Sequence, residues 1–82
     1  MSAKTHRCPC CGYLTLQNRG ANEICPVCYW EDDGQDIGDL DTVRGGPNGK
    51  LSLRDAMIAF ARYGAVEERF KSKVRKPLPE EI

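Results

Sequence analysis

The sequence predicts a small α+β domain, a β-hairpin followed by one or two helices, that cysteine side chains hold together. Three observations lead to this fold class: 82 residues, five cysteines, and a single segment of clear helical periodicity. A chain of this length buries only about 60% of the surface that it exposes when unfolded, so its apolar core is thin. Small domains of this kind usually need a disulfide or a metal ion for stability.

The cysteines are expected to bind metal rather than to form disulfides. Residues 1–7 contain no apolar stretch like that of a signal peptide. The longest apolar run, residues 56–61, is far shorter than the roughly 20 residues that a membrane helix needs. We therefore expect a cytoplasmic protein without membrane association, in a compartment that keeps thiols reduced. An odd number of cysteines also fits a disulfide framework poorly.

Two CPxC motifs, each expected to form a tight turn called a knuckle, contain the predicted metal ligands. The first is Cys8-Pro9-Cys10-Cys11-Gly12 and the second is Cys25-Pro26-Val27-Cys28, with thirteen residues between Cys11 and Cys25. A two-residue gap lets both thiolates of a knuckle reach one ion, and four thiolates complete a tetrahedron. We predict one Zn²⁺ per chain; iron is the alternative occupant, as in rubredoxin-like knuckles. Packed reduced thiols and dithiol redox chemistry are less favoured readings. The predicted ligands are Cys8, Cys11, Cys25 and Cys28.

Two further residues near the first knuckle, Cys10 and His6, are alternative ligands. Cys10 and Cys11 are adjacent, and an ordinary knuckle does not point both at one ion, so Cys10 is expected to be a free thiol. It is either a bystander or, less favoured, a redox-sensing thiol. His6 is expected to be solvated, because the four thiols already complete the coordination sphere.

The predicted organisation is a flexible arm at 1–7, one domain at 8–76 and a flexible tail at 77–82. Residues 8–31 hold the knuckles and a hairpin that pairs 13–17 with 23–25, with 29–31 as a third short strand. Residues 32–50 form an acidic, glycine-rich loop. Its carboxylates do not match the EF-hand spacing, so a solvated charge run, or pairing with Arg54 or the basic tail, is favoured over a Ca²⁺ site.

Residues 52–74 are predicted to be helical. Ser52 and Asp55 resemble a capping box, a helix should run from Leu53 to about Tyr63, and Gly64 is well placed to end it. A second, shorter helix is expected over residues 66–73. The apolar face of the first helix is predicted to comprise Leu53, Met57, Phe60 and Ala61.

Four stretches together resemble the bacterial cysteine-rich CPCC family: CPCCGYLTL, ICPVCYWEDDG, GGPNGKLSL and the segment from YGAVEERF to VRKP. The likeness covers about residues 6–77. It implies a zinc-ribbon-like or rubredoxin-like knuckle domain without an assigned biochemical role, so only the four knuckle cysteines carry over. Met57 and Ala59 depart from the family pattern, in which a basic residue and an amide are more usual.

The function predicted from these features is a protein-interaction or regulatory module built on a structural zinc site. Trp30, the acidic loop and the helical pair would face a partner protein. A fully thiolate-ligated zinc has no open position, and no nucleophile with a base is evident, so we predict no enzyme activity. Formal charge is zero, and four thiolates with one Zn²⁺ would make it about −2, so nucleic-acid binding is possible but not favoured. Thiol-redox or metal sensing through Cys10 is the other alternative.

Overall fold

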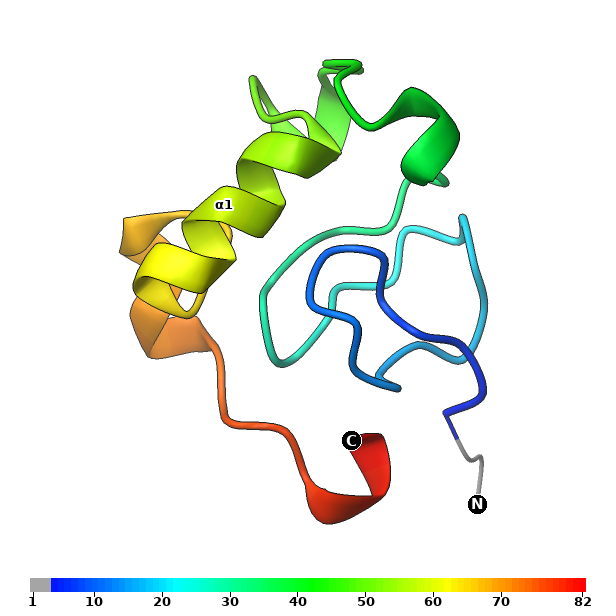
Figure 1. Ribbon diagram of the computed structural model, residues 1–82, viewed down its shortest axis with the longest axis vertical. Coiled ribbons are helices and arrows are strands. Elements are labelled where there is room, and N and C mark those ends of the chain that lie inside the picture. Colours follow the sequence, from blue (N-terminus) through cyan, green and yellow to red (C-terminus); the bar gives the residue numbers. More distant parts are fainter. Residues whose placement is uncertain (1–3) are drawn as a thin grey trace.

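The computed structural model describes residues 4–82. Its one α-helix is α1, Leu53–Tyr63, and the other helices are four short 3₁₀ helices. Two loops formed by the knuckles lie beside α1 (Figure 1). Residues 4–82 contain no β-strand, and extended pairing is limited to two isolated antiparallel bridges. The 3₁₀ helices are η1 (Ile37–Asp39), η2 (Gly46–Asn48), η3 (Glu68–Lys73) and η4 (Pro79–Glu81).

The predicted hairpin between residues 13–17 and 23–25 is not what the structure shows. Leu16 instead pairs with His6, and Ile24 pairs with Glu31. Each CPxC turn reverses the chain on its own, so the residues before and after the same turn become nearest neighbours. The knuckles are therefore two separate loops side by side, and the zinc-ribbon hairpin is not confirmed.

α1 has the predicted bounds and caps. Ser52 Oγ accepts a hydrogen bond from Asp55 N at 3.1 Å, and Asp55 Oδ2 accepts one from Ser52 N at 3.2 Å, which completes a capping box. Gly64 ends the helix with a φ of 79° and donates its N–H to Phe60 O at 2.8 Å.

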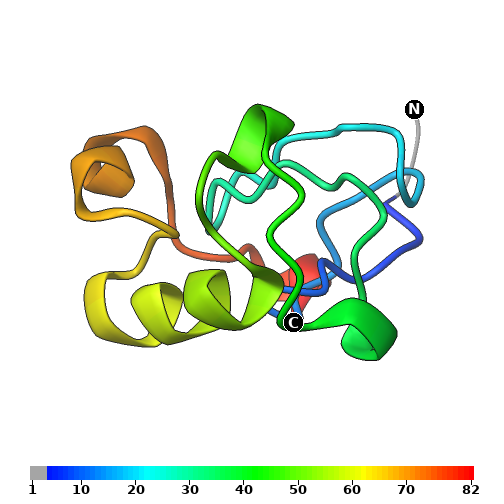
Figure 2. The same cartoon turned by 90° about the horizontal axis from the view of Figure 1, so that it is seen from above.

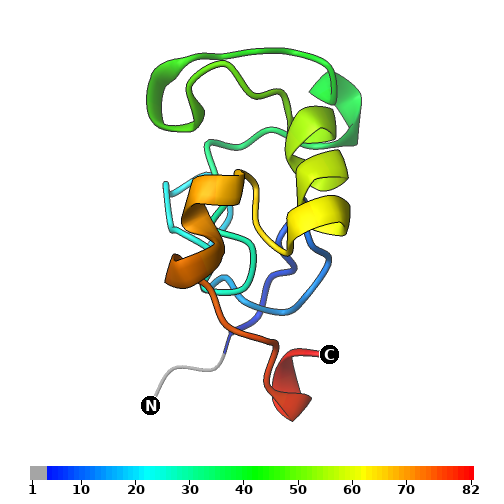
Figure 3. The ribbon, with the colours of Figure 1, turned by 90° about the vertical axis from the view of Figure 1, so that its left-hand side faces the viewer.

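The buried face of α1 differs from the prediction at two positions, Ala56 and Ala61. Leu53 and Ala56 are buried and Met57 packs partly against the core, whereas Ala61 is exposed. The second predicted helix is present only as the 3₁₀ helix η3, which lies beside α1 (Figure 3). The core joins both knuckles to α1 through fully buried residues: Cys8, Leu16, Cys25, Cys28, Trp30, Leu53 and Ala56.

The acidic loop at 32–50 is held by arginine pairs. Asp32 is fully buried, and its Oδ2 accepts bonds from Arg19 Nε at 2.9 Å and Gly20 N at 2.7 Å. The predicted pairing with Arg54 is present, whereas the arginines of the basic segment pair with Glu67 and Glu81 and not with the loop. η1 in this loop lies at the opposite end of the molecule from η3 (Figure 2). The remaining carboxylate pairs are Asp36 with Arg19, Asp39 with Arg44 and Asp41 with Arg54.

The C-terminal segment, predicted as a flexible tail, packs against the domain. Glu81 in η4 is buried, and its carboxylate accepts two bonds from Arg75, each 2.8 Å long, and one from Leu78 N. Glu81 O also accepts the N–H of Leu14, next to the first knuckle. At the other end, residues 1–3 of the predicted arm lie outside the described residues, and His6 already belongs to the fold through Leu16.

We expect Glu81→Gln to lower the free energy of unfolding by about 1–3 kcal/mol, because hydrogen bonds to a charged group contribute about that much. The Arg75 guanidinium lowers the pKa of Glu81, so the side chain is a carboxylate at neutral pH. Urea unfolding of the metal-bound protein measures the change. Glu80, the exposed neighbour of Glu81, provides the matched control: Glu80→Gln should change the free energy of unfolding by no more than about 0.5 kcal/mol. Equal effects of the two substitutions would contradict a role for the Arg75 pair.

Candidate metal centre

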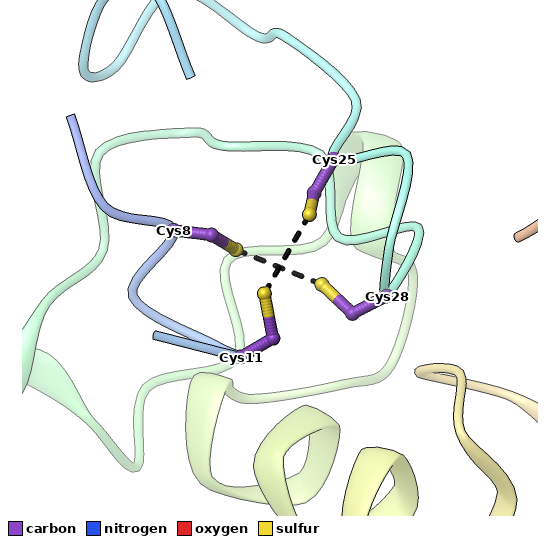
Figure 4. Close-up of side chains that lie close together, drawn as sticks. All are labelled: Cys8, Cys11, Cys25 and Cys28. Atoms are coloured by element: carbon purple, nitrogen blue, oxygen red, sulfur yellow. Dashed lines mark hydrogen bonds between the residues drawn. The ribbon is translucent and has the colours of Figure 1, made fainter. Parts of the chain in front are cut away.

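The four predicted ligands converge on one point. The sulfur atoms of Cys8, Cys11, Cys25 and Cys28 all lie within 4.8 Å of one another, and they face each other from the two knuckles (Figure 4). Cys8 Sγ is 3.6 Å from Cys28 Sγ, and Cys11 Sγ is 3.7 Å from Cys25 Sγ. A tetrahedron with metal–sulfur bonds of about 2.3 Å has sulfur–sulfur edges of about 3.8 Å. The four-cysteine cluster therefore fits one tetrahedral metal ion.

The two knuckles are built alike. In the first, Gly12 N donates to Cys8 O at 2.8 Å, and Cys8 N donates to Tyr13 O at 2.9 Å. In the second, Tyr29 N and Cys25 N make the corresponding bonds, to Cys25 O at 2.8 Å and to Trp30 O at 2.9 Å. Each knuckle thus fixes the backbone on both sides of its two ligands without help from the other.

In both knuckles, the residue directly after the second cysteine has a left-handed backbone conformation. Gly12 has a φ of 80°, which glycine adopts without steric cost. Tyr29 takes the same conformation, with a φ of 74°, although a side chain is strained there. Its ring packs on Phe70 of η3, with centroids 4.5 Å apart. This contact offsets the strain and joins the second knuckle to η3.

Gly12→Ala tests the need for the left-handed turn, and we expect a loss of about 1–2 kcal/mol in the free energy of unfolding. A Cβ built at Gly12 has no heavy atom within 4 Å, so backbone strain is the whole effect. Thermal unfolding of the metal-bound protein measures it. Gly38 is the control, because its added Cβ also has open space and its φ is not in the left-handed region. A loss in Gly38→Ala as large as in Gly12→Ala would contradict the explanation.

Two groups outside the knuckle motif contact the sulfurs. The Thr15 hydroxyl lies 3.0 Å from Cys25 Sγ and can donate to it as a thiolate. Trp30 N donates to Cys28 Sγ at 3.4 Å. Such bonds disperse the charge of a thiolate ligand and orient it. The spacing of the cysteines does not predict that Thr15 contacts a ligand. Thr15 reaches the cluster because the next residue, Leu16, pairs with His6.

The cluster cannot hold four negative charges without a cation. The pKa of Cys25 is lowered, because its thiolate accepts hydrogen bonds from the neighbouring thiols, that of Cys11 first. The pKa values of the other three thiols are raised. The chief cause is a hydrogen bond with Cys11 for Cys8, with Cys25 for Cys11, and with Cys10 for Cys28. A bound cation must therefore displace protons from the cluster, so acid weakens binding.

Neither alternative ligand belongs to the cluster. Cys10 is buried, with 6% of its surface exposed, and it contacts Cys28 from outside the group of four sulfurs. His6 is exposed, and its Nδ1 lies 3.0 Å from Gln17 O. In the described part of the chain, no other group of three or more histidine, cysteine or acidic side chains is arranged to hold a metal.

Comparison with known proteins identifies the family. The family model described as cysteine-rich CPCC matches residues 6–81, which include both knuckles, α1 and nearly all of the C-terminal segment. No curated protein and no solved structure matches the chain. None of the helices between residues 4 and 82 is long and apolar enough to cross a membrane. With its four-cysteine cluster, compatible with metal binding, the chain belongs to the cysteine-rich CPCC family.

Proposed function

We propose that the protein binds one zinc ion in a structural role, and that the domain held by this ion is a non-catalytic module that binds another protein. The convergence of four sulfurs within 4.8 Å, from two separately built knuckles, carries the proposal. Core residues from both knuckles and α1 surround the cluster, so the ion would join segments that otherwise share little secondary structure. Reduced thiols are required, which fits a cytoplasmic protein.

Zinc is the proposed occupant because a closed four-cysteine site is its common structural environment in proteins. Iron would accept the same tetrahedral sulfur geometry. All four coordination positions would be filled by thiolates, so neither water nor substrate has an open position on the ion. This supports the absence of metal-dependent catalysis.

Two other functions have weaker support. A redox-sensing thiol should be accessible to oxidants, whereas Cys10 is buried. A nucleic-acid module usually presents many unpaired cations, whereas the zinc-bound chain would carry a net charge of about −2. The face predicted from the sequence also changes, because Trp30 is fully buried and the acidic loop is paired with arginines. The helical pair, α1 and η3, is the part of the predicted face that still supports partner binding.

Metal analysis and cobalt substitution test the structural role. Protein expressed with both zinc and iron available should contain one zinc per chain. The cobalt-substituted protein should show the absorption of a tetrahedral tetrathiolate site, and added cyanide or azide should leave that spectrum unchanged, since no ligand position is open. Iron in place of zinc would contradict the proposed occupant. A spectrum that shifts with the added anion would contradict a closed, purely structural site.

A further inference from the structure

A cleft of about 360 Å³ lies between the end of α1, the second knuckle and the segment that follows η3. Both aromatic and basic side chains line it. This basic cleft is formed by Tyr13, Phe60, Tyr63, Lys71, Arg75 and Lys76, together with smaller apolar residues. Its volume corresponds to one or two large side chains, and its combination of apolar wall and fixed charge is typical of a recognition site.

The cleft carries unbalanced positive charge. No aspartate or glutamate lines it, and Arg75 is held by Glu81. Lys71 and Lys76 are exposed and make no ion pair with any residue between 4 and 82. The arginines at the opposite end of the molecule, by contrast, are occupied by the carboxylates of the acidic loop. A negatively charged ligand is therefore favoured at the cleft.

The cleft is fixed to the metal centre. Arg75 N donates to Pro26 O at 3.1 Å, and Val66 N donates to Cys28 O at 2.9 Å. These bonds tie the segments on both sides of η3 to the second knuckle. Because the proposed ion holds that knuckle, the shape of the cleft depends on it.

We propose that the basic cleft binds an acidic segment of a partner protein, with one large apolar side chain between Tyr13, Phe60 and Tyr63 and flanking carboxylates on Lys71 and Lys76. This inference rests on the proposed function and names the chemistry of the partner. A peptide is favoured over nucleic acid for two reasons. The cleft offers only two unpaired lysines, whereas nucleic-acid interfaces often neutralise six to ten phosphates, and the zinc-bound chain as a whole would repel a polyanion.

Selection of displayed random peptides on the zinc-bound protein tests the proposal. The selected sequences should share one large apolar residue with at least two flanking aspartates or glutamates. Synthetic peptides of those sequences should shift the amide signals of residues 60–64 and 71–77, and their affinity should fall as salt rises. The double variant Lys71→Glu/Lys76→Glu should weaken binding at least tenfold, and Tyr63→Ala should weaken it at constant charge.

Lys50→Glu/Lys73→Glu is the control, because it makes the same change in net charge outside the cleft and should leave affinity within about twofold. Selected peptides without acidic residues, signal shifts elsewhere, or equal losses in the two double variants would overturn the proposal. Tighter binding of a single-stranded RNA 12-mer than of the peptides, at physiological salt, would also overturn it. The cobalt spectrum separates the two proposals: an intact tetrathiolate spectrum without peptide binding rejects the cleft alone, whereas a shifted or absent spectrum rejects the metal role.

Discussion

Replacing Cys25 with serine should abolish tight metal binding and leave the chain without a stable fold. Cys25 is fully buried, and its sulfur lies 3.7 Å from that of Cys11 and 3.0 Å from the Thr15 hydroxyl. Structural zinc contributes on the order of 10 kcal/mol in small zinc-binding peptides, which is comparable with the whole stability of a typical domain. Elemental analysis of the purified variant and its circular dichroism spectrum measure the two losses.

Cys10→Ser is the matched control for that experiment. It removes a buried thiol of the first knuckle that lies outside the four-cysteine cluster. We expect one metal ion per chain and a folded spectrum for this variant, with a stability change of no more than about 2 kcal/mol. A Cys25→Ser protein that keeps its fold and one tightly bound ion would contradict the assigned ligand set. Loss of the ion in Cys10→Ser would contradict it equally.

Trp30→Ala should give the largest loss among substitutions outside the ligands, about 3–5 kcal/mol in the free energy of unfolding. Trp30 is fully buried and is the largest buried side chain of the core. It directly follows the second knuckle, and its backbone N–H donates to the sulfur of Cys28. The cavity left by alanine would open beside the metal centre. Urea unfolding of the zinc-bound protein measures the loss.

Trp30→Phe keeps most of the apolar volume and serves as the comparison. It also removes the indole Nε1, which is buried without a hydrogen-bond partner in the described structure. Removal of an unpaired polar group offsets part of the lost packing, so we expect a cost of less than half of that for alanine. Equal costs for alanine and phenylalanine would show that packing at Trp30 does not determine stability.

The grouping of the four cysteines and the bounds of α1 could be predicted from the sequence because both depend on local spacing. Two cysteines three positions apart lie on one tight turn whatever surrounds them. Ser52, Asp55 and Gly64 mark the ends of α1 through bonds to their own neighbours. The structure brings the four cysteines together and gives α1 the predicted bounds.

The hairpin could not be predicted correctly because it required a choice between distant pairings. Residues 13–17 have strand-like composition, but Leu16 pairs back across its own knuckle to His6. A signal for this existed in the sequence: CPCCGY and CPVCYW have the same length and the same ligand positions, which indicates two equivalent turns. Equivalent turns close with equivalent local bonds, and those bonds leave no long strand to pair between the knuckles.

The contacts made by the C-terminal segment cannot be predicted from the residues near it in the sequence. Glu81 is buried because Arg75 and Leu78 satisfy its carboxylate and Leu14 bonds to its backbone oxygen. From the sequence alone, a charged residue near two prolines is predicted to be exposed unless these partners are known. The basic cleft was missed for the same reason, since Tyr13 and Lys71 are far apart in sequence and line the same cleft only in the fold.

Titration of the reduced, metal-free protein with Zn²⁺, followed by the dispersion of its amide NMR signals, tests the central claim most directly. If the four-cysteine cluster holds the fold, the metal-free spectrum is collapsed, and dispersed signals grow in proportion to added zinc until one equivalent per chain. A fully dispersed spectrum before any metal is added would contradict the claim, as would a plateau at any other ratio.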